Sequence, residues 1–103
     1  MNTILYHKLF ARWLEKLKDR RAYGAIVQRI DNARYGNFGA TRVLRDGVCE
    51  MKIDMGPGYR VYYARKEKTV YLLLIGGDKS SQQKDIEKAV ALWKECSDEG
   101  QHE

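Results

Sequence analysis

The fold is decided by two glycine-containing turns, GPGYR at residues 56–60 and GGDKSSQ at residues 76–82. Each turn presents one cation, first Arg60 and then Lys79. Two strand-like runs lie between the turns, and an antiparallel meander would return both cations to the same end of a sheet. Because a positive cluster at a sheet edge can hold a phosphate backbone, the pattern favours an RNA-directed protein.

The residues around these turns predict a sheet. The run VCEMKIDM at residues 48–55 alternates between apolar and polar side chains, which is typical of a strand with one buried face and one polar face. Asp46-Gly47 before it is a strong signal for a two-residue hairpin. The charged run Lys66–Lys68 is expected to form the next turn. Strands are expected at residues 3–6, 41–45, 48–55, 59–65 and 70–75.

Apolar side chains recur at helical spacing in three other segments. Two of them, residues 10–17 and 22–33, are expected to form an antiparallel helical hairpin that the glycines of residues 36–39 end. A third helix is predicted from a Ser80–Gln83 capping box, with a frayed tail from about residue 97. The stripes are Phe10, Trp13, Leu14 and Leu17, then Ala22, Ala25, Ile26, Ile30 and Ala33, then Ile86, Ala89, Val90 and Trp93.

This order predicts one α+β domain over residues 1–103, with the helices packed on a mainly antiparallel sheet of four to five strands. No apolar run is long enough for a membrane span, and the N-terminus lacks a signal-peptide pattern, so a cytoplasmic location is expected. Cys49 and Cys96 lie far apart and outside metal-ligand spacing. We therefore expect reduced thiols, no bound metal and no cofactor.

The chain carries a formal net charge of +5, with a sequence pI near 9.3. This balance favours a polyanionic partner, although many Lys and Arg side chains of any small protein are simply solvated. The positions of the cations are more informative. The turn near Pro57 should pair Lys52 with a residue close to Arg60, and the turn near Glu67 should pair Arg60 with a residue near Leu74. Lys79 would then return to the Arg60 end.

Such a cluster could bind the phosphate backbone of RNA, with Arg as a planar fork and Lys as a point charge. Further side chains could contact RNA, namely Arg42, Arg45, Tyr62 and Arg65. The candidates for general acid–base chemistry are Glu50, Asp54, Tyr62, Asp78 and Asp85. Each also has a purely structural interpretation: Glu50 as a cross-strand partner of a cation, Asp85 as a favourable charge at a helix start, and the tyrosines as core.

Four segments together resemble the RelE/ParE superfamily of type II toxins, in particular the HigB-like addiction module killer proteins of the phage Gp49-like group. They are Phe10–Asp19, Gly36–Gly39, Gly58–Tyr63 and Leu74–Ile86. The resemblance implies a RelE-like fold and a toxin that cleaves mRNA, usually in the ribosomal A site. It also implies a cognate antitoxin, usually a helix-turn-helix DNA-binding protein.

Residue by residue, the resemblance implies that Arg60 contacts the scissile phosphate and that Lys79 is a second catalytic cation. Lys52 corresponds to basic residues on the preceding strand, and Glu50 or Asp54 is the expected base. The chain departs from the family pattern at residues 82–86, QQKDI, where well-studied members carry a tyrosine or a histidine-containing cluster. Two alternatives therefore stay open: a ParE-type inhibitor of DNA gyrase without nuclease activity, and an inactive remnant that only binds its antitoxin.

Overall fold

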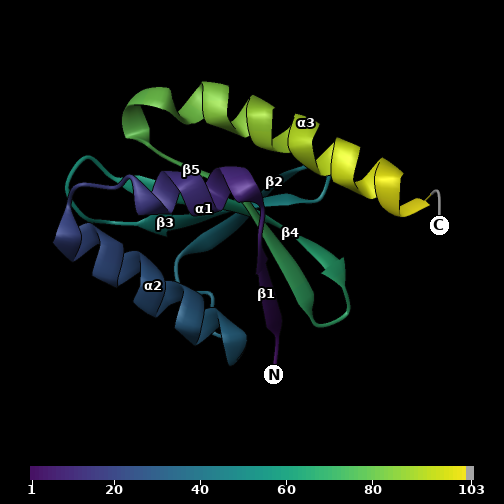
Figure 1. Ribbon diagram of the computed structural model, residues 1–103, viewed down its shortest axis with the longest axis horizontal. Coiled ribbons are helices and arrows are strands. Elements are labelled where there is room, and N and C mark those ends of the chain that lie inside the picture. Colours follow the sequence, from purple (N-terminus) through teal and green to yellow (C-terminus); the bar gives the residue numbers. More distant parts are fainter. Residues whose placement is uncertain (102–103) are drawn as a thin grey trace.

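The protein, for which we analysed a computed structural model, is built on one five-stranded mixed sheet (Figure 1). The structure describes the backbone of residues 1–101 and the side chains of residues 1–97. The strands lie in the order β1-β5-β4-β3-β2, with β1 parallel to β5 and all other neighbours antiparallel. Their bounds are β1 (Thr3–Tyr6), β2 (Thr41–Arg45), β3 (Val48–Ile53), β4 (Tyr59–Glu67) and β5 (Val70–Asp78).

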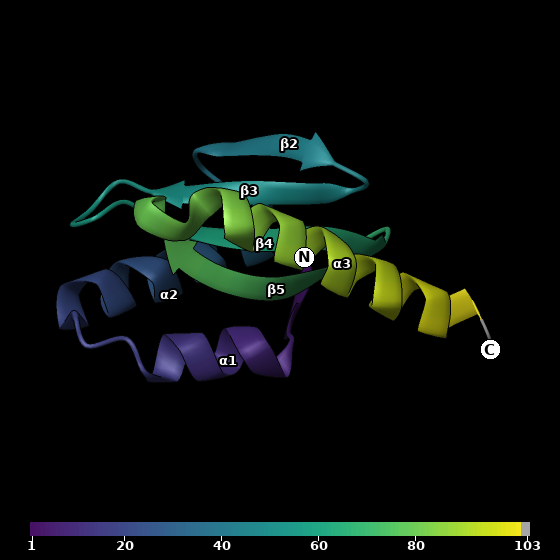
Figure 2. The same ribbon diagram turned by 90° about the horizontal axis from the view of Figure 1, so that it is seen from above.

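Helices cover both faces of this sheet, as Figure 2 shows. The predicted hairpin is formed by α1 (Lys8–Glu15) and α2 (Arg20–Arg34), which pack with the sheet around one apolar cluster. A short 3-10 turn, η1 (Lys79–Ser81), leads into α3 (Gln82–Gln101), which packs on the other face around a second cluster. The α+β class, the helical hairpin and the C-terminal helix are thus as predicted, and the architecture is consistent with a RelE-like fold.

Local signals explain where the first two helices begin. The His7 side chain accepts a hydrogen bond of 3.0 Å from the backbone N–H of Leu9 at the start of α1. Asp19 accepts from the N–H groups of Arg21 and Ala22 at the start of α2, which is ordinary N-capping. The predicted stripes face the sheet, because their apolar side chains form most of the buried helical surface, namely Phe10, Leu14, Ala22, Ile26, Ile30 and Ala33.

The β2–β3 hairpin forms at the predicted place. Asp46 and Gly47 have φ angles of 53° and 86°, the left-handed values that a type I′ turn requires. Beyond the turn, Met51 and Ile53 are buried in the cluster under α1 and α2. The alternating pattern therefore predicted correctly which face of β3 packs against α1 and α2.

Two adjacent glycines of β5 allow helices to approach the strand from both faces. A Cβ atom on Gly76 would lie 2.2 Å from the Trp13 ring of α1. A Cβ atom on Gly77 would lie 1.9 Å from the Asp85 carboxylate of α3. Since neither position has room for a side chain, the Gly76-Gly77 pair sets how closely both helices pack against this end of the sheet.

Three sequence expectations need correction. The charged run Lys66–Lys68 does not form the whole turn, because β4 continues to Glu67 and β5 begins at Val70. The turn is therefore centred later, and Arg60 pairs with Gly77 rather than with a residue near Leu74. The start of the last helical segment is capped by Asp78, whose side chain accepts from the N–H of Ser80, so the predicted Ser80–Gln83 capping box is wrong.

The C-terminal helix extends to Gln101, and fraying of the tail from about residue 97 stays a prediction. The rest of the predicted tail, residues 102–103, lies outside the described residues. Within the described part of the chain, no helix combines the length and the apolar character that crossing a membrane requires.

Candidate functional site

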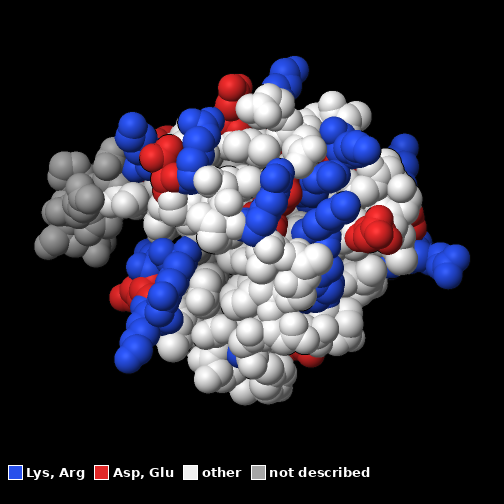
Figure 3. Space-filling view, turned by 180° about the vertical axis from the view of Figure 1, so that it is seen from behind, with Lys and Arg blue, Asp and Glu red and all other residues white. Residues whose placement is uncertain are grey.

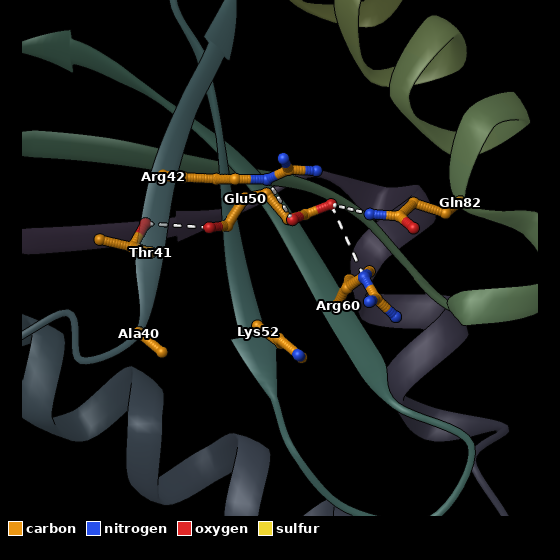
Figure 4. Close-up of a pocket in the computed structure, with 7 residues that line it drawn as sticks. All are labelled: Ala40, Thr41, Arg42, Glu50, Lys52, Arg60 and Gln82. Atoms are coloured by element: carbon orange, nitrogen blue, oxygen red, sulfur yellow. Dashed lines mark hydrogen bonds and ion pairs between the residues drawn. The ribbon is translucent and has the colours of Figure 1, made fainter.

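A cavity of about 440 Å³ opens between the β2–β3–β4 part of the sheet and the first turn of α3 (Figure 4). Seen from the β2 side, Lys and Arg side chains gather near the centre of the molecular surface (Figure 3). Three cations but only one acid line the cavity. We call it the cationic pocket, and its lining residues are Ala40, Thr41, Arg42, Glu50, Lys52, Arg60 and Gln82.

Glu50 is the centre of this pocket, although it is only 4% exposed. Its Oε1 atom accepts a hydrogen bond of 2.8 Å from Nε of Arg42. Its Oε2 atom accepts one of 2.9 Å from Nε2 of Gln82 and lies 3.7 Å from Nε of Arg60. One carboxylate on β3 therefore ties together β2, β4 and the first turn of α3 (Figure 4).

The electrostatics of Glu50 follow from this network. Burial disfavours its charged form, but the hydrogen bonds from Arg42 and Gln82 and the charges of Arg42 and Arg60 outweigh burial and lower the pKa of Glu50. Glu50 is consequently ionised at neutral pH, with both oxygens engaged. A carboxylate in this state is a weak proton acceptor, and its geometry suits holding cations in place better than it suits general base catalysis.

Arg60 is the most buried of the three cations that line the pocket. It is 6% exposed, and its Nη1 donates a hydrogen bond of 2.7 Å to the carbonyl of Gly58. Gly58 has a φ of +80°, and a Cβ atom there would lie 3.2 Å from Arg60 Nη1. The GPGYR turn thus provides both the hydrogen-bond acceptor and the room that this guanidinium needs.

Lys52 lies directly opposite Arg60 across the β3–β4 ladder, as the sequence predicted. Both Lys52 and Arg42 are exposed, with 59% of the Arg42 side chain accessible. Lys79 is also exposed and lies at the same end of the sheet, its Cβ 3.8 Å from where a Cβ on Gly58 would be. Lys79 does not line the cationic pocket, however, so it forms an outer cation on the other side of the turn.

The remaining predicted contacts with RNA fall away from the pocket. Arg45 is exposed at the end of β2 and does not line it. Arg65 lies toward the opposite end of β4, where its guanidinium donates to the carbonyl of Lys68. Tyr62 is fully buried beneath α3, so its ring is not accessible for stacking on a base.

The candidate acid–base groups are also spread out. Asp54 is exposed just beyond β3 and does not line the pocket. Asp78 is engaged as a helix cap, and Asp85 accepts a hydrogen bond of 2.6 Å from the Ser81 hydroxyl. The buried Tyr62 hydroxyl has no hydrogen-bond partner among the described residues. Burial raises the pKa of this hydroxyl, with the Glu50 charge reinforcing the effect, so it does not ionise near neutral pH.

Sequence reasoning missed two polar residues of the pocket. The sequence placed Gln82 in the second glycine turn and in the QQKDI stretch without giving it a role in a site, yet its amide donates to Glu50. The Thr41 hydroxyl donates to the Glu50 carbonyl at 3.0 Å and is 2.6 Å from the Tyr63 hydroxyl. A register argument could have found Thr41, because it neighbours Arg42 on a predicted strand, whereas only the packing of α3 brings Gln82 to β3.

The sequence matches the family model described as "Phage derived protein Gp49-like (DUF891)" over residues 12–94. This protein belongs to the Gp49-like family. Every residue that lines the cationic pocket falls within the matched segment. The chain is also 46% identical to an uncharacterized protein of Haemophilus influenzae over 86 residues, which are 84% of this chain and 87% of the relative. The pocket is therefore part of the domain that defines this Gp49-like protein.

Proposed function

We propose that this Gp49-like protein is the toxin of a toxin–antitoxin pair and that it inhibits translation by cutting mRNA at the cationic pocket. The observation that supports this most is the convergence of Arg42, Lys52 and Arg60 around one cavity. A single buried carboxylate anchors the two arginines, so they are preorganised without being fully neutralised. Fixed cations at an open pocket suit a phosphate backbone better than they suit an apolar ligand.

The proposed reaction uses the RNA itself as nucleophile. The 2′-oxygen attacks the adjacent phosphorus, the bond from phosphorus to the 5′-oxygen breaks, and the products are a 2′,3′-cyclic phosphate and a 5′-hydroxyl end. A base takes the proton of the 2′-hydroxyl, and the departing 5′-oxygen gains one. Negative charge grows on the nonbridging oxygens in the transition state, where each well-placed cation contributes on the order of 3 kcal/mol.

Within this proposal the residues have different tasks. Arg60 and Lys52 bind the scissile phosphate, Arg42 binds its neighbour, and Lys79 attracts the strand from outside the pocket. Glu50 holds Arg42 and Arg60 rather than moving a proton, because both of its oxygens are engaged. Asp54 is the base candidate that we retain, since it is exposed close to Lys52 in the sequence and makes no ion pair among the described residues.

The proposal includes partners. We expect translating ribosomes to present the mRNA in the cytoplasm, and a helix-turn-helix antitoxin to neutralise the toxin. Growth arrest with intact mRNA and inhibited supercoiling would instead indicate a gyrase inhibitor. Antitoxin binding without growth arrest would indicate an inactive remnant.

The test is cleavage of a reporter mRNA in a reconstituted translation system. We expect wild-type protein to cut the message, and we expect Lys79→Ala, Arg42→Gln and Lys52→Met to cut it progressively less well, because the substituted cation lies closer to the scissile phosphate in that order. Arg60→Lys, which keeps a charge at a buried position, should lose most activity because it loses the fork. Arg21→Lys, an exposed change on α2, is the matched control. Undiminished cutting by both Arg60→Lys and Lys52→Met would refute these roles.

A further inference from the structure

Arg29 of α2 connects the helical hairpin to the wall of the cationic pocket. Its Nη1 donates a hydrogen bond of 2.6 Å to the carbonyl of Lys52. Its Nη2 donates to the carbonyls of Phe38 at 2.9 Å and Ala40 at 3.1 Å. One guanidinium therefore binds three backbone carbonyls from β3 and from the segment that leads into β2.

Two of these carbonyls belong to residues that line the pocket, Lys52 and Ala40. The same two residues are joined directly, since the Lys52 N–H donates to the Ala40 carbonyl at 2.9 Å. This contact lies at the end of β2, beyond the Thr41–Met51 pair of the ladder. Arg29 is thus bound to both sides of the junction from which the Lys52 side chain projects.

The loop that leads into β2 leaves room for the Arg29 side chain. Gly39 has a φ of +67°, and a Cβ atom on it would lie 2.8 Å from Arg29 Nε. The Nε atom is buried without a hydrogen-bond partner, and Arg29 forms no ion pair among the described residues. Partial burial lowers the pKa of Arg29, yet a guanidinium stays protonated, and its hydrogen bonds to other described residues go to backbone carbonyls.

We infer that Arg29 is a positioning residue for the proposed phosphate site: it fixes the Lys52 backbone and the Ala40–Thr41 wall, and so aims the Lys52 ammonium. This inference rests on the proposed function for its consequence, but its geometric part stands on the carbonyl contacts alone. Lysine cannot replace Arg29, because a single ammonium on a flexible stem lacks the fork that spans β3 and the loop. We therefore expect Arg29 to act through the geometry of its hydrogen bonds, and not merely through the presence of a positive charge.

The first measurement is amide hydrogen exchange, which needs no RNA. In Arg29→Lys the Lys52 amide should exchange faster than in wild type, whereas the Val61 amide of central β4 should change only as global stability changes. Arg21→Lys on the same helix is the control and should leave both amides unchanged. An unaltered Lys52 amide in a folded Arg29→Lys protein would overturn the inference, whatever the protein binds.

The second measurement is fluorescence anisotropy with a short 2′-O-methyl oligoribonucleotide, which lacks the attacking hydroxyl. We expect Arg29→Lys and Arg29→Gln to weaken binding similarly, by on the order of tenfold. The effect should largely vanish in a Lys52→Met background but persist in an Arg60→Gln background. Full binding by Arg29→Lys, or equal effects in both backgrounds, would contradict positioning of Lys52. Faster Lys52 exchange with no RNA binding even by wild type would contradict a phosphate site that binds free RNA and would leave the positioning intact.

Discussion

Glu50 is a buried acid, and its role is to hold the polar groups around it in place. It joins Arg42, Arg60 and Gln82, which come from three different elements of the fold. A buried carboxylate that is fully paired is a sound anchor, but removal of one partner from such a pair leaves the other charge uncompensated. Most of the preorganisation of the pocket consequently depends on this one residue.

Replacement of Glu50 by Gln should therefore destabilise the protein. Gln can still accept one hydrogen bond, but it leaves the buried Arg60 guanidinium without its ion pair. The expected loss is about 3 kcal/mol in the free energy of unfolding, measured by urea denaturation. Glu67→Gln, an exposed change at the far end of β4, is the control. Equal stability of the two variants would show that the network contributes nothing.

The same residue predicts a pH dependence. Folding lowers the pKa of Glu50, so the unfolded chain binds this proton more tightly. Its contribution is fully present above the unfolded pKa, about 4.3, and is lost as the pH falls through the lower folded value. Thermal melts of wild type and Glu50→Gln should therefore converge as the pH is lowered through this range. A constant difference between the two melting temperatures would contradict the assignment.

At this scale the sequence predicted the pairing across the β3–β4 turn but not the burial of Glu50. The Lys52–Arg60 register followed from a short glycine turn, which leaves the chain few alternatives. The alternation in β3 suggested that Glu50 lies on a polar face, but α3 covers that part of the face and buries it. Burial by a distant helix depends on tertiary packing, and no local pattern around Glu50 reports it.

At the scale of elements, α3 packs closely against β5 because the strand has no side chain at their contact. Gly77 pairs with Arg60, so its missing Cβ lies on the face where η1 and α3 begin. This close approach brings Gln82 to Glu50. The start of α3 and the pocket are therefore coupled through one glycine.

Gly77→Ala should displace the first turn of α3 and disturb the Gln82–Glu50 hydrogen bond. Because the added Cβ would overlap the Asp85 carboxylate and crowd the Ser81 hydroxyl, the expected cost is about 1–3 kcal/mol in unfolding free energy. Gly24→Ala is a matched control: it lies in α2 with nothing within 4 Å of the added Cβ, and it should stabilise the helix by about 0.5–1 kcal/mol. Denaturant titration of both variants measures their unfolding free energies. A Gly77→Ala protein as stable as wild type would contradict the packing argument.

Elements with strong local signals were predicted well, and others were not. Asp46-Gly47 fixed the β2–β3 hairpin because both residues tolerate a positive φ. The β4–β5 turn was misplaced because Lys66 and Glu67 look like turn residues although they belong to an extended strand. Exposed strand ends carry charged side chains as readily as turns do, so charge alone did not locate this turn.

At the scale of the whole molecule, the cationic pocket is a product of the folded sheet. The three pocket cations come from β2, β3 and β4, so they converge only when the sheet has folded. The order of the elements and the fold class could be predicted from the sequence and from the family resemblance. The place of Gln82 in the pocket could not, because it enters only through the packing of α3.

Binding to single-stranded RNA should weaken with salt. If three phosphates are neutralised, the logarithm of the binding constant should fall against the logarithm of salt concentration with a slope of about −2. Lys52→Met should reduce the magnitude of this slope by about 0.7, whereas Lys68→Met, at the β4–β5 turn, should leave it unchanged. Equal slopes for wild type and Lys52→Met would place the RNA elsewhere on the surface.

We propose that the cationic pocket cuts mRNA, and mapping of RNA 5′ ends after brief induction of the protein is the direct test of this proposal. Cells that express wild-type protein should accumulate new 5′-hydroxyl ends within coding sequences. Cells that express a folded Arg42→Gln, Lys52→Met double variant should not. Growth arrest without new ends, or the same ends from the double variant, would contradict the claim.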